Sequence, residues 1–258
     1  MKIFTKLMSL MIAFVVCFGC LTACSFGSGN NVQPDEINPD EYVAKVDIKF
    51  ATNDDKLKSA VDAMNSSAEI CAKDGNIYVV TSSGVNTTFA KREYTLIDGM
   101  LYCRTNVEVS GLSVTETKKA EMGAENADKL ISDVGAGASV GIEDFYAVDV
   151  AMYGERTSYT CSDAFDETKL SLASILSDDF SAIGATVTVT DVEYTLETEG
   201  EVPMSSVLSC SYSINLGGET YEITMRLYTS YDYKTPVSIV LPEKAEEFKT
   251  VSYSEIVG

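Results

Sequence analysis

The hydrophobic pattern of this chain is clearest on either side of Asp98-Gly99. Residues 87–97 and 100–109 alternate between apolar and polar side chains, and an Asp-Gly pair between two such segments is typical of a β-hairpin. A shift of one residue in the pairing would mix apolar and polar side chains on both faces of the hairpin, so the pattern predicts one register. When Ile97 faces Met100, the facing pairs are Leu96–Leu101, Tyr94–Cys103 and Ala90–Val107 on a mainly apolar face, and Glu93–Arg104 and Lys91–Asn106 on a polar face.

A second hairpin is predicted around Gly217-Gly218, between residues 207–216 and 219–229. Serine, threonine and charged residues occupy one of its faces, so the sheet is expected to be apolar on one side only. The apolar face carries Leu208, Cys210, Tyr212, Ile214, Tyr221, Ile223, Met225 and Leu227.

Shorter strand patterns occur elsewhere along the chain. The apolar phase changes between Val189 and Val192, which predicts a β-bulge at that point. The strand patterns cover residues 44–50, 69–72, 76–81, 153–161, 186–195 and 236–241.

Three segments, residues 57–68, 125–134 and 166–183, carry apolar side chains at helical spacing. The first follows a capping sequence at Thr52-Asn53-Asp54, and the third ends before Gly184. Each helix needs an apolar surface to pack on, and the sheet offers one. We therefore predict an α+β fold in which a curved antiparallel β-sheet forms an unclosed half-barrel with amphipathic helices packed on its concave face.

The first 23 residues have the layout of a secretory signal peptide. Lys2 and Lys6 precede an almost wholly apolar run over residues 7–21, which is too short and wrongly flanked for a permanent transmembrane helix. The run ends in Leu21-Thr22-Ala23-Cys24, which resembles the bacterial lipobox. That resemblance implies cleavage before Cys24, a diacylglycerol on its sulfur and an acyl chain, such as palmitate, on the new amino terminus. An ordinary signal peptide with a chance cysteine is the alternative.

The segment after Cys24 is polar and cannot bury a core. It contains Gly-Ser-Gly-Asn-Asn and two Pro-Asp-Glu triplets, so residues 24–42 are predicted to form a lipidated amino terminus and a disordered tether. Residues 43–258 are then predicted to form a single domain.

Composition excludes several classes of function. The net charge of −20 repels nucleic acid and anionic lipid surfaces, so the acyl chains are expected to provide the membrane attachment. The chain has no histidine, which removes histidine-dependent catalysis and histidine metal sites. Catalysis would need paired carboxylates or a serine–lysine pair, and the carboxylates lie where helix capping and solubility explain them. We expect no enzyme activity, no metal and no cofactor.

Four cysteines remain beyond the signal and the lipidation site: Cys71, Cys103, Cys161 and Cys210. In an exported domain they could form two disulfides with three connectivities. The alternative is that they are small buried apolar residues.

The chain resembles the bacterial lipoprotein-carrier superfamily that includes LolA, LolB and the mycobacterial LppX type. The resemblance rests on the lipobox, an early helix before a strand meander, paired helices in mid-chain, the Gly217-Gly218 hairpin and the ending over residues 228–242. It implies an unclosed barrel that receives acyl chains or another hydrophobic ligand, without catalytic residues.

Two functions follow as hypotheses. The first is a lipid-anchored carrier on the outer face of the cell membrane, which binds a lipid-like ligand between sheet and helices. The second is a surface lipoprotein with a filled core that binds an unidentified protein, for which the tyrosines at 228, 231 and 233 offer weak support. The expected cavity lining of the carrier is Leu208, Tyr212, Ile214, Tyr221, Ile223, Met225, Leu227, Leu172, Leu176 and Phe180.

Overall fold

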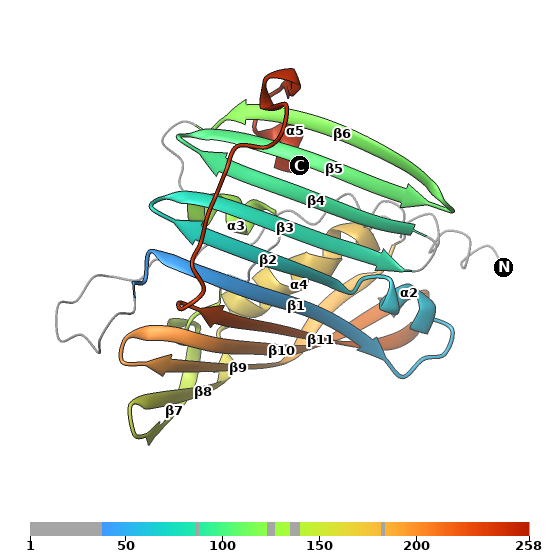
Figure 1. Cartoon of the computed structure of the whole chain (residues 1–258). Helices are drawn as coiled ribbons and strands as arrows, with labels where there is room; N and C mark the ends of the chain where they lie inside the picture. Colours follow the sequence, from blue (N-terminus) through green and yellow to red (C-terminus); the bar gives the residue numbers. More distant parts are fainter. Residues whose placement is uncertain (1–37, 86–87, 123–126, 135–139, 182–183, 258) are drawn as a thin grey trace. The chain divides into compact units, whose positions relative to one another are not determined.

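The computed structural model describes residues 38–85, 88–122, 127–134, 140–181 and 184–257 (Figure 1). The described residues fall into two compact units. Unit 1 contains residues 47–66 and 140–228, and unit 2 contains the remaining described residues. The predicted signal peptide, Cys24 and most of the predicted tether lie outside the described residues.

Strands dominate the described residues, and they form one 12-stranded sheet that is mostly antiparallel. The strand bounds are β1 Glu41–Thr52, β2 Ser66–Lys73, β3 Asn76–Val85, β4 Thr88–Ile97, β5 Met100–Val109, β6 Leu112–Glu121, β7 Phe145–Tyr153, β8 Arg156–Ala164, β9 Thr186–Glu199, β10 Val202–Leu216, β11 Glu219–Asp232 and β12 Lys249–Thr250. Their order is β12-β6-β5-β4-β3-β2-β1-β11-β10-β9-β8-β7, and β12 runs parallel to β6. This confirms the predicted open sheet.

The helices are few and mostly short. Their bounds are α2 Lys58–Asp62, α3 Ala127–Asp133, α4 Asp166–Ser181 and α5 Ser254–Val257, with 3₁₀ turns η1 Ile142–Asp144 and η2 Ala245–Glu247. Among the described residues, none is both long and apolar enough to cross a bilayer.

In unit 2, the β4–β5 hairpin has the predicted register in every pair, from Ile97–Met100 to Ala90–Val107. Asp98 and Gly99 both have positive φ, as a two-residue hairpin turn requires. The next hairpin turns at Ser110-Gly111, again with positive φ at both residues, and leads into β6. No strand was predicted over β6, because its apolar alternation stops after Val114.

In unit 1, the predicted bulge is present. The register between β9 and β10 shifts between the pairs Cys210–Val192 and Tyr212–Val189. The burial pattern also confirms the one-sided face of β10 and β11, where alternate residues are buried. The exact register of the Gly217-Gly218 hairpin stays a prediction.

Two predicted elements are wrong. The helix expected over residues 57–68 ends at Asp62, and β2 begins at Ser66, because Ala68, Ile70 and Ala72 alternate and are buried as strand residues. The strand expected over residues 236–241 is absent from this described segment. There the amide of Val237 donates to the Glu41 carboxylate instead of to a neighbouring strand.

Residues 233–257 of unit 2, which we call the strap, cross one face of its sheet and end at α5 (Figure 1). Arg104 donates to the backbone oxygen of Glu243, and the rings of Tyr102 and Phe248 meet edge to face. At the end of the strap, the Tyr253 hydroxyl donates to the carboxylate of Asp133 on α3. The strap therefore passes around the β6 edge of unit 2, from the face of Tyr102 to the face that carries α3.

Candidate functional site

The first candidate site is the interior of unit 1, where α4 contacts β9 and β10. Asp166 and Glu167 lie in the first turn of α4, where carboxylates interact favourably with the helix dipole. The helix ends before Gly184, whose positive φ suits a residue just beyond a helix. This places the apolar stripe of α4, which includes Leu172 and Leu176, in the interior.

Nine of the ten predicted lining residues are buried within unit 1; they are Leu172, Leu176, Phe180, Leu208, Tyr212, Ile214, Ile223, Met225 and Leu227. Tyr221 differs, because it is only half-buried and its hydroxyl donates to the nearby Glu219 carboxylate at the end of the hairpin.

Tyr212 links the sheet directly to α4. Its hydroxyl oxygen lies 3.3 Å from the backbone oxygen of Leu172 and 3.6 Å from the Met225 sulfur. Burial raises the pKa of Tyr212 well above its usual range, so the phenol stays neutral and remains a donor. At this point helix and strand touch, and a ligand could enter between them only by moving α4.

A second polar group in the unit 1 interior is the Thr198 hydroxyl on β9. The residue is buried, and its Oγ1 has no hydrogen-bond partner among the described residues. Thr198 stands opposite Thr157 on one side and Pro203 on the other. A buried hydroxyl without a partner costs free energy, which makes this position a local weakness of the interior.

The second candidate site is the face of the unit 2 sheet that carries α3. Cross-strand pairing places Leu101, Cys103, Val107 and Val109 on this face. Leu101 and Cys103 are buried, whereas Val109 is exposed. Apolar side chains therefore occur again beyond the covered part of the face.

The exposed part of this face is formed by the ends of β5 and β6. Leu112 stands opposite Val109, and Val114 stands opposite Val107. Leu112 is 76% exposed and Val114 is 66% exposed. We call these four residues the unit 2 apolar end.

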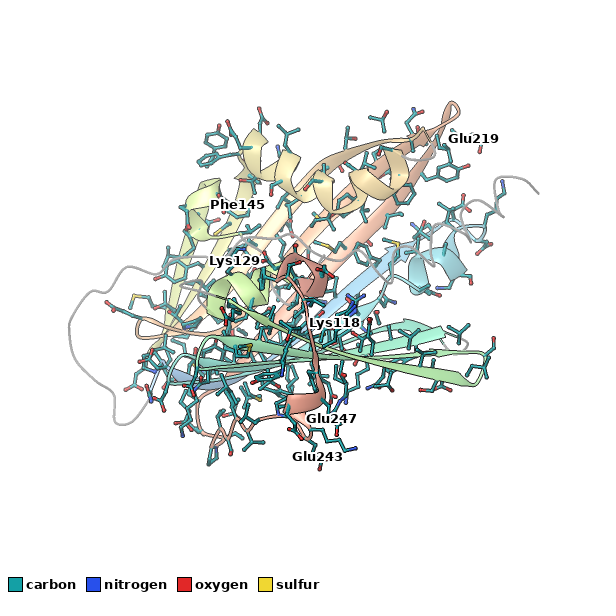
Figure 2. The ribbon with its side chains drawn as sticks, turned by 90° about the horizontal axis from the view of Figure 1, so that it is seen from above. Lys118, Lys129, Phe145, Glu219, Glu243 and Glu247 are labelled. Atoms are coloured by element: carbon teal, nitrogen blue, oxygen red, sulfur yellow. The ribbon has the colours of Figure 1, made fainter. Side chains whose placement is uncertain are left out.

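A polar band separates the unit 2 apolar end from the buried part of the face. It contains Arg92, Thr105, Glu116 and Lys118, and the Lys118 ammonium lies 3.1 Å from the Glu116 carboxylate. Figure 2 shows Lys118 and Lys129 on one side of this sheet, with Glu243 and Glu247 of the strap on the other. The face thus offers apolar side chains on both sides of a band that holds two cationic side chains, Arg92 and Lys118, and one carboxylate, Glu116.

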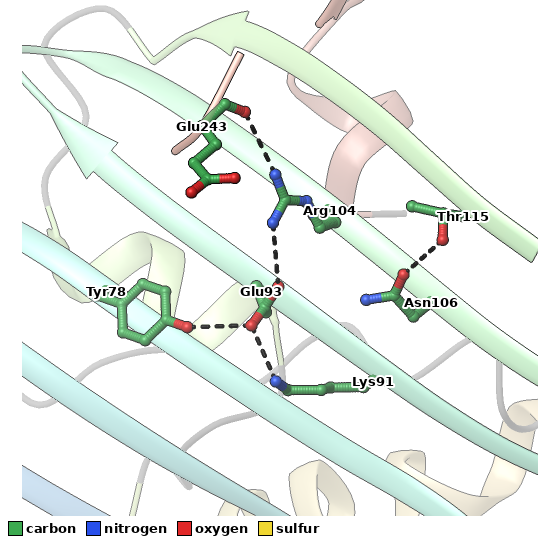
Figure 3. Close-up of polar contacts among 7 residues, drawn as sticks. All are labelled: Tyr78, Lys91, Glu93, Arg104, Asn106, Thr115 and Glu243. Atoms are coloured by element: carbon green, nitrogen blue, oxygen red, sulfur yellow. Dashed lines mark hydrogen bonds and ion pairs between the residues drawn. The ribbon is translucent and has the colours of Figure 1, made fainter. Parts of the chain in front are cut away.

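The opposite face of unit 2 carries a polar network centred on Glu93 (Figure 3). Its carboxylate accepts from the Lys91 ammonium at 2.9 Å and the Tyr78 hydroxyl at 3.2 Å, and it lies 4.0 Å from the Arg104 guanidinium. Burial acts to raise the pKa of Glu93, but these partners outweigh it and hold the pKa below its ordinary value. Burial, together with Glu93, raises the pKa of Tyr78 to about 12. The Glu93 carboxylate is held ionised by several partners, and the Tyr78 phenol stays neutral. These states favour a structural role for the network over proton transfer.

All four remaining cysteines are free thiols. In unit 1, Cys161 on β8 and Cys210 on β10 are separated by β9, and in unit 2, Cys71 on β2 and Cys103 on β5 are separated by two strands. Strands lie about 4.8 Å apart, so each pair exceeds the reach of a disulfide, about 7 Å between Cα atoms. Burial raises the pKa of each thiol. This favours the apolar-residue alternative over disulfides within either unit.

The tyrosines at 228, 231 and 233, which gave weak support to the protein-binding hypothesis, are partly packed. In unit 2, the rings of Tyr231 and Tyr233 lie 5.8 Å and 6.0 Å from the ring of Tyr42. Burial raises the pKa of Tyr233 above its usual range. In unit 1, Tyr228 is partly exposed. The sequence cannot distinguish a packed tyrosine cluster from an exposed one, because both show the same spacing.

In the part of the chain that the structure describes, no group of three acidic, cysteine or histidine side chains could hold a metal ion. No family model matches the chain, and no curated protein matches it.

Solved structures give only weak similarity. The ywiB protein from Bacillus subtilis aligns with 10% identity and a TM-score of 0.21, over 74% of this chain and 92% of that one. The dehydratase domain from the CurF module of curacin polyketide synthase aligns with 10% identity and a TM-score of 0.17, over 74% and 76%. Likeness at this level carries no argument for fold or activity.

Proposed function

We propose that this chain is a lipoprotein anchored through Cys24 to the outer face of the cell membrane, where it binds or carries a hydrophobic, lipid-like ligand without catalysis. The lipobox at residues 21–24, the apolar run before it and the basic start support the anchor. Two or three acyl chains hold a protein on a membrane stably, where one chain does not.

The observation that carries the ligand proposal is the unit 2 apolar end. Soluble domains bury most of their contiguous apolar surface, and an exposed apolar patch is typical of a binding surface. Leu112 and Val114 extend such a face without a break in the strand pairing. A lipid-like ligand could settle there without displacing any described helix.

The proposal also covers how the helices lie on the sheet. We propose that amphipathic helices pack on the concave face of a curved half-barrel, with seven of the predicted lining residues on the sheet and Leu172, Leu176 and Phe180 opposite them on α4. In unit 1, a ligand that reached Tyr212 would first have to separate α4 from β10, because the Tyr212–Leu172 hydrogen bond joins them. Binding in unit 1 would therefore require a movement of α4.

The ligand proposal is tested with a fluorescent fatty acid titrated into the full chain. Leu112→Glu is expected to weaken binding by at least tenfold, because a charge replaces apolar contact area. Leu241→Glu is the matched control, since Leu241 is also exposed but lies in the strap. Absence of saturable binding, or equal loss in both variants, would contradict the proposal.

The anchor is tested separately by cell fractionation of Cys24→Ser. We expect the wild-type chain in the membrane fraction, with a mass that includes diacylglycerol and an amide-linked acyl chain. The variant is expected to lose that added mass and to leave the membrane fraction.

The alternative, a protein-binding lipoprotein with a filled core, is favoured by one observation. Tyr212 is wholly buried and contacts both Leu172 and Met225, which is how a closed core is packed. A ligand-free chain that takes up no lipid would support this alternative.

A further inference from the structure

Strand β7 lies at one end of the strand order, so one of its sides has no strand partner among the described residues. An unpaired strand edge presents a row of backbone N–H and C=O groups that only another extended chain can pair in full. The nine residues of β7 include one charged side chain, Asp149, and neither lysine nor proline. Strand edges are normally protected by those residues or by a covering segment.

The other end of the strand order is protected in this way. There β12 covers part of β6 by pairing with Lys118 and Lys119, and Glu116 adds a further charge. Among the described residues, the β7 edge has no covering strand and no lysine, and Asp149 is its one charge, although the chain as a whole is rich in charge. This contrast marks β7 as a surface that is suited to pairing.

Apolar side chains accompany the unpaired edge. Val148, Val150 and Met152 alternate along β7 and share one face, where they stand opposite Cys161, Tyr159 and Thr157 of β8. Val150 is 58% exposed and Met152 is 74% exposed. An added strand with its own apolar row on this face would cover them.

We propose that β7 is the docking edge for a second copy of this chain, with the two β7 strands antiparallel about a two-fold axis at Val150. The proposal does not depend on ligand binding. A two-fold axis makes the edge its own complement, since each copy supplies the same strand and the same apolar row. Only registers that keep the apolar row on one face are compatible with the pleat.

Charge and exposure select among these registers. An axis at Asp149 would set the two carboxylates face to face, which is unfavourable. An axis at Val148 would leave Met152 and Tyr153 outside the strand pair, although both are highly exposed. With the axis at Val150, Asp149 stands opposite the partner's Ala151 and Val148 stands opposite the partner's Met152.

Cysteine cross-linking tests both the dimer and its register, because a residue on the axis faces itself. In the purified full chain under mild oxidation, Val150→Cys is expected to form a covalent dimer at least tenfold faster than Val240→Cys. Val240 is 71% exposed but lies in the strap, so it controls for exposure. The wild-type chain sets the background from its own cysteines.

Three results would contradict the proposed dimer or its register. Equal rates for the two variants would overturn the proposal. A faster reaction of Asp149→Cys than of Val150→Cys would overturn the register. In sedimentation experiments, Val150→Lys is expected to remove the wild-type dimer while its far-ultraviolet circular dichroism is unchanged, and persistence of the dimer would also contradict the proposal.

Discussion

The hydroxyl of Tyr212 on β10 donates a hydrogen bond to the backbone oxygen of Leu172 on α4, at 3.3 Å, in the buried interior of unit 1. This contact joins the largest described helix to the strands whose alternation was the clearest signal in the second half of the chain. It also sets the condition for any ligand in unit 1, since α4 must move before the space around Tyr212 opens.

Truncation at Tyr212 is expected to separate the contribution of the hydrogen bond from that of the ring. Tyr212→Phe should lower the free energy of unfolding by about 1 kcal/mol, the usual net value of one buried hydrogen bond. Tyr212→Ala should lower it by about 3–5 kcal/mol, because a buried aromatic ring is replaced by a cavity. Urea titrations measure both. Equal losses in the two variants would show that the ring contributes nothing beyond its hydroxyl.

Thr198→Val is expected to stabilise the chain. The buried Thr198 hydroxyl has no partner among the described residues, and valine keeps the shape while removing the unpaired group. We expect a gain of about 1 kcal/mol in the free energy of unfolding. Thr188→Val is the matched control on the same strand, where the hydroxyl is exposed and donates to the Ser213 backbone oxygen. A loss of stability in Thr198→Val larger than in the control would contradict this account.

Acidification is expected to release the strap at Glu41. The backbone amide of Val237 and the ammonium of Lys73 both bond to the Glu41 carboxylate, which lowers its pKa from the ordinary 4.5. A depressed folded-state pKa gives stability that is present above 4.5 and is lost as pH falls through the lower folded value. Glu41→Gln should therefore reduce the slope of unfolding free energy against pH below 4.5.

The control for this titration is Glu243→Gln, in the same strap, because Glu243 contacts Arg104 through its backbone oxygen. Identical slopes in wild type and Glu41→Gln would show that Glu41 does not couple the strap to pH.

Thiol labelling is expected to distinguish one cysteine from the other three. Cys71 is partly exposed, whereas Cys103, Cys161 and Cys210 are buried with pKa values raised by burial. In the folded chain, Cys71 should react first with a thiol reagent, and all four should react after unfolding without prior reduction. Tandem mass spectrometry identifies the labelled sites. A disulfide between any two of the four would contradict this prediction.

The sequence predicted the fold best where two independent patterns agree. Around Asp98-Gly99, the turn residues and the charge pairing of Glu93 with Arg104 specify the same register, and the structure has it. Between Val189 and Val192, the shift in apolar phase was sufficient to locate a bulge.

Prediction failed where a short apolar pattern fits two structures. Over residues 57–68 the spacing suits a helix, but Ala68 also belongs to the alternating series of β2, and pairing within the sheet prevails. Over residues 236–241 the sequence is rich in β-branched residues, but Val237 bonds to a side chain in place of a strand.

The candidate site was harder to predict than the fold. The ten lining residues were recognised as apolar and inward-facing, and nine are buried, but the walls of a pocket and the interior of a core have the same composition. The exposed apolar residues of β6 and β7 were missed, because exposure depends on which strand lies at an edge. That is a property of topology, and the local pattern does not contain it.

The central claim is that this chain carries a hydrophobic ligand, and native mass spectrometry of the full chain purified from cells tests it most directly. Solvent extraction of the same sample identifies any molecule that is bound. The account predicts a stoichiometric lipid or other apolar adduct, beyond the covalent lipid on Cys24, that is lost in Leu112→Glu. A clean ligand-free mass, with no uptake when lipids are offered, would contradict it and favour the protein-binding alternative.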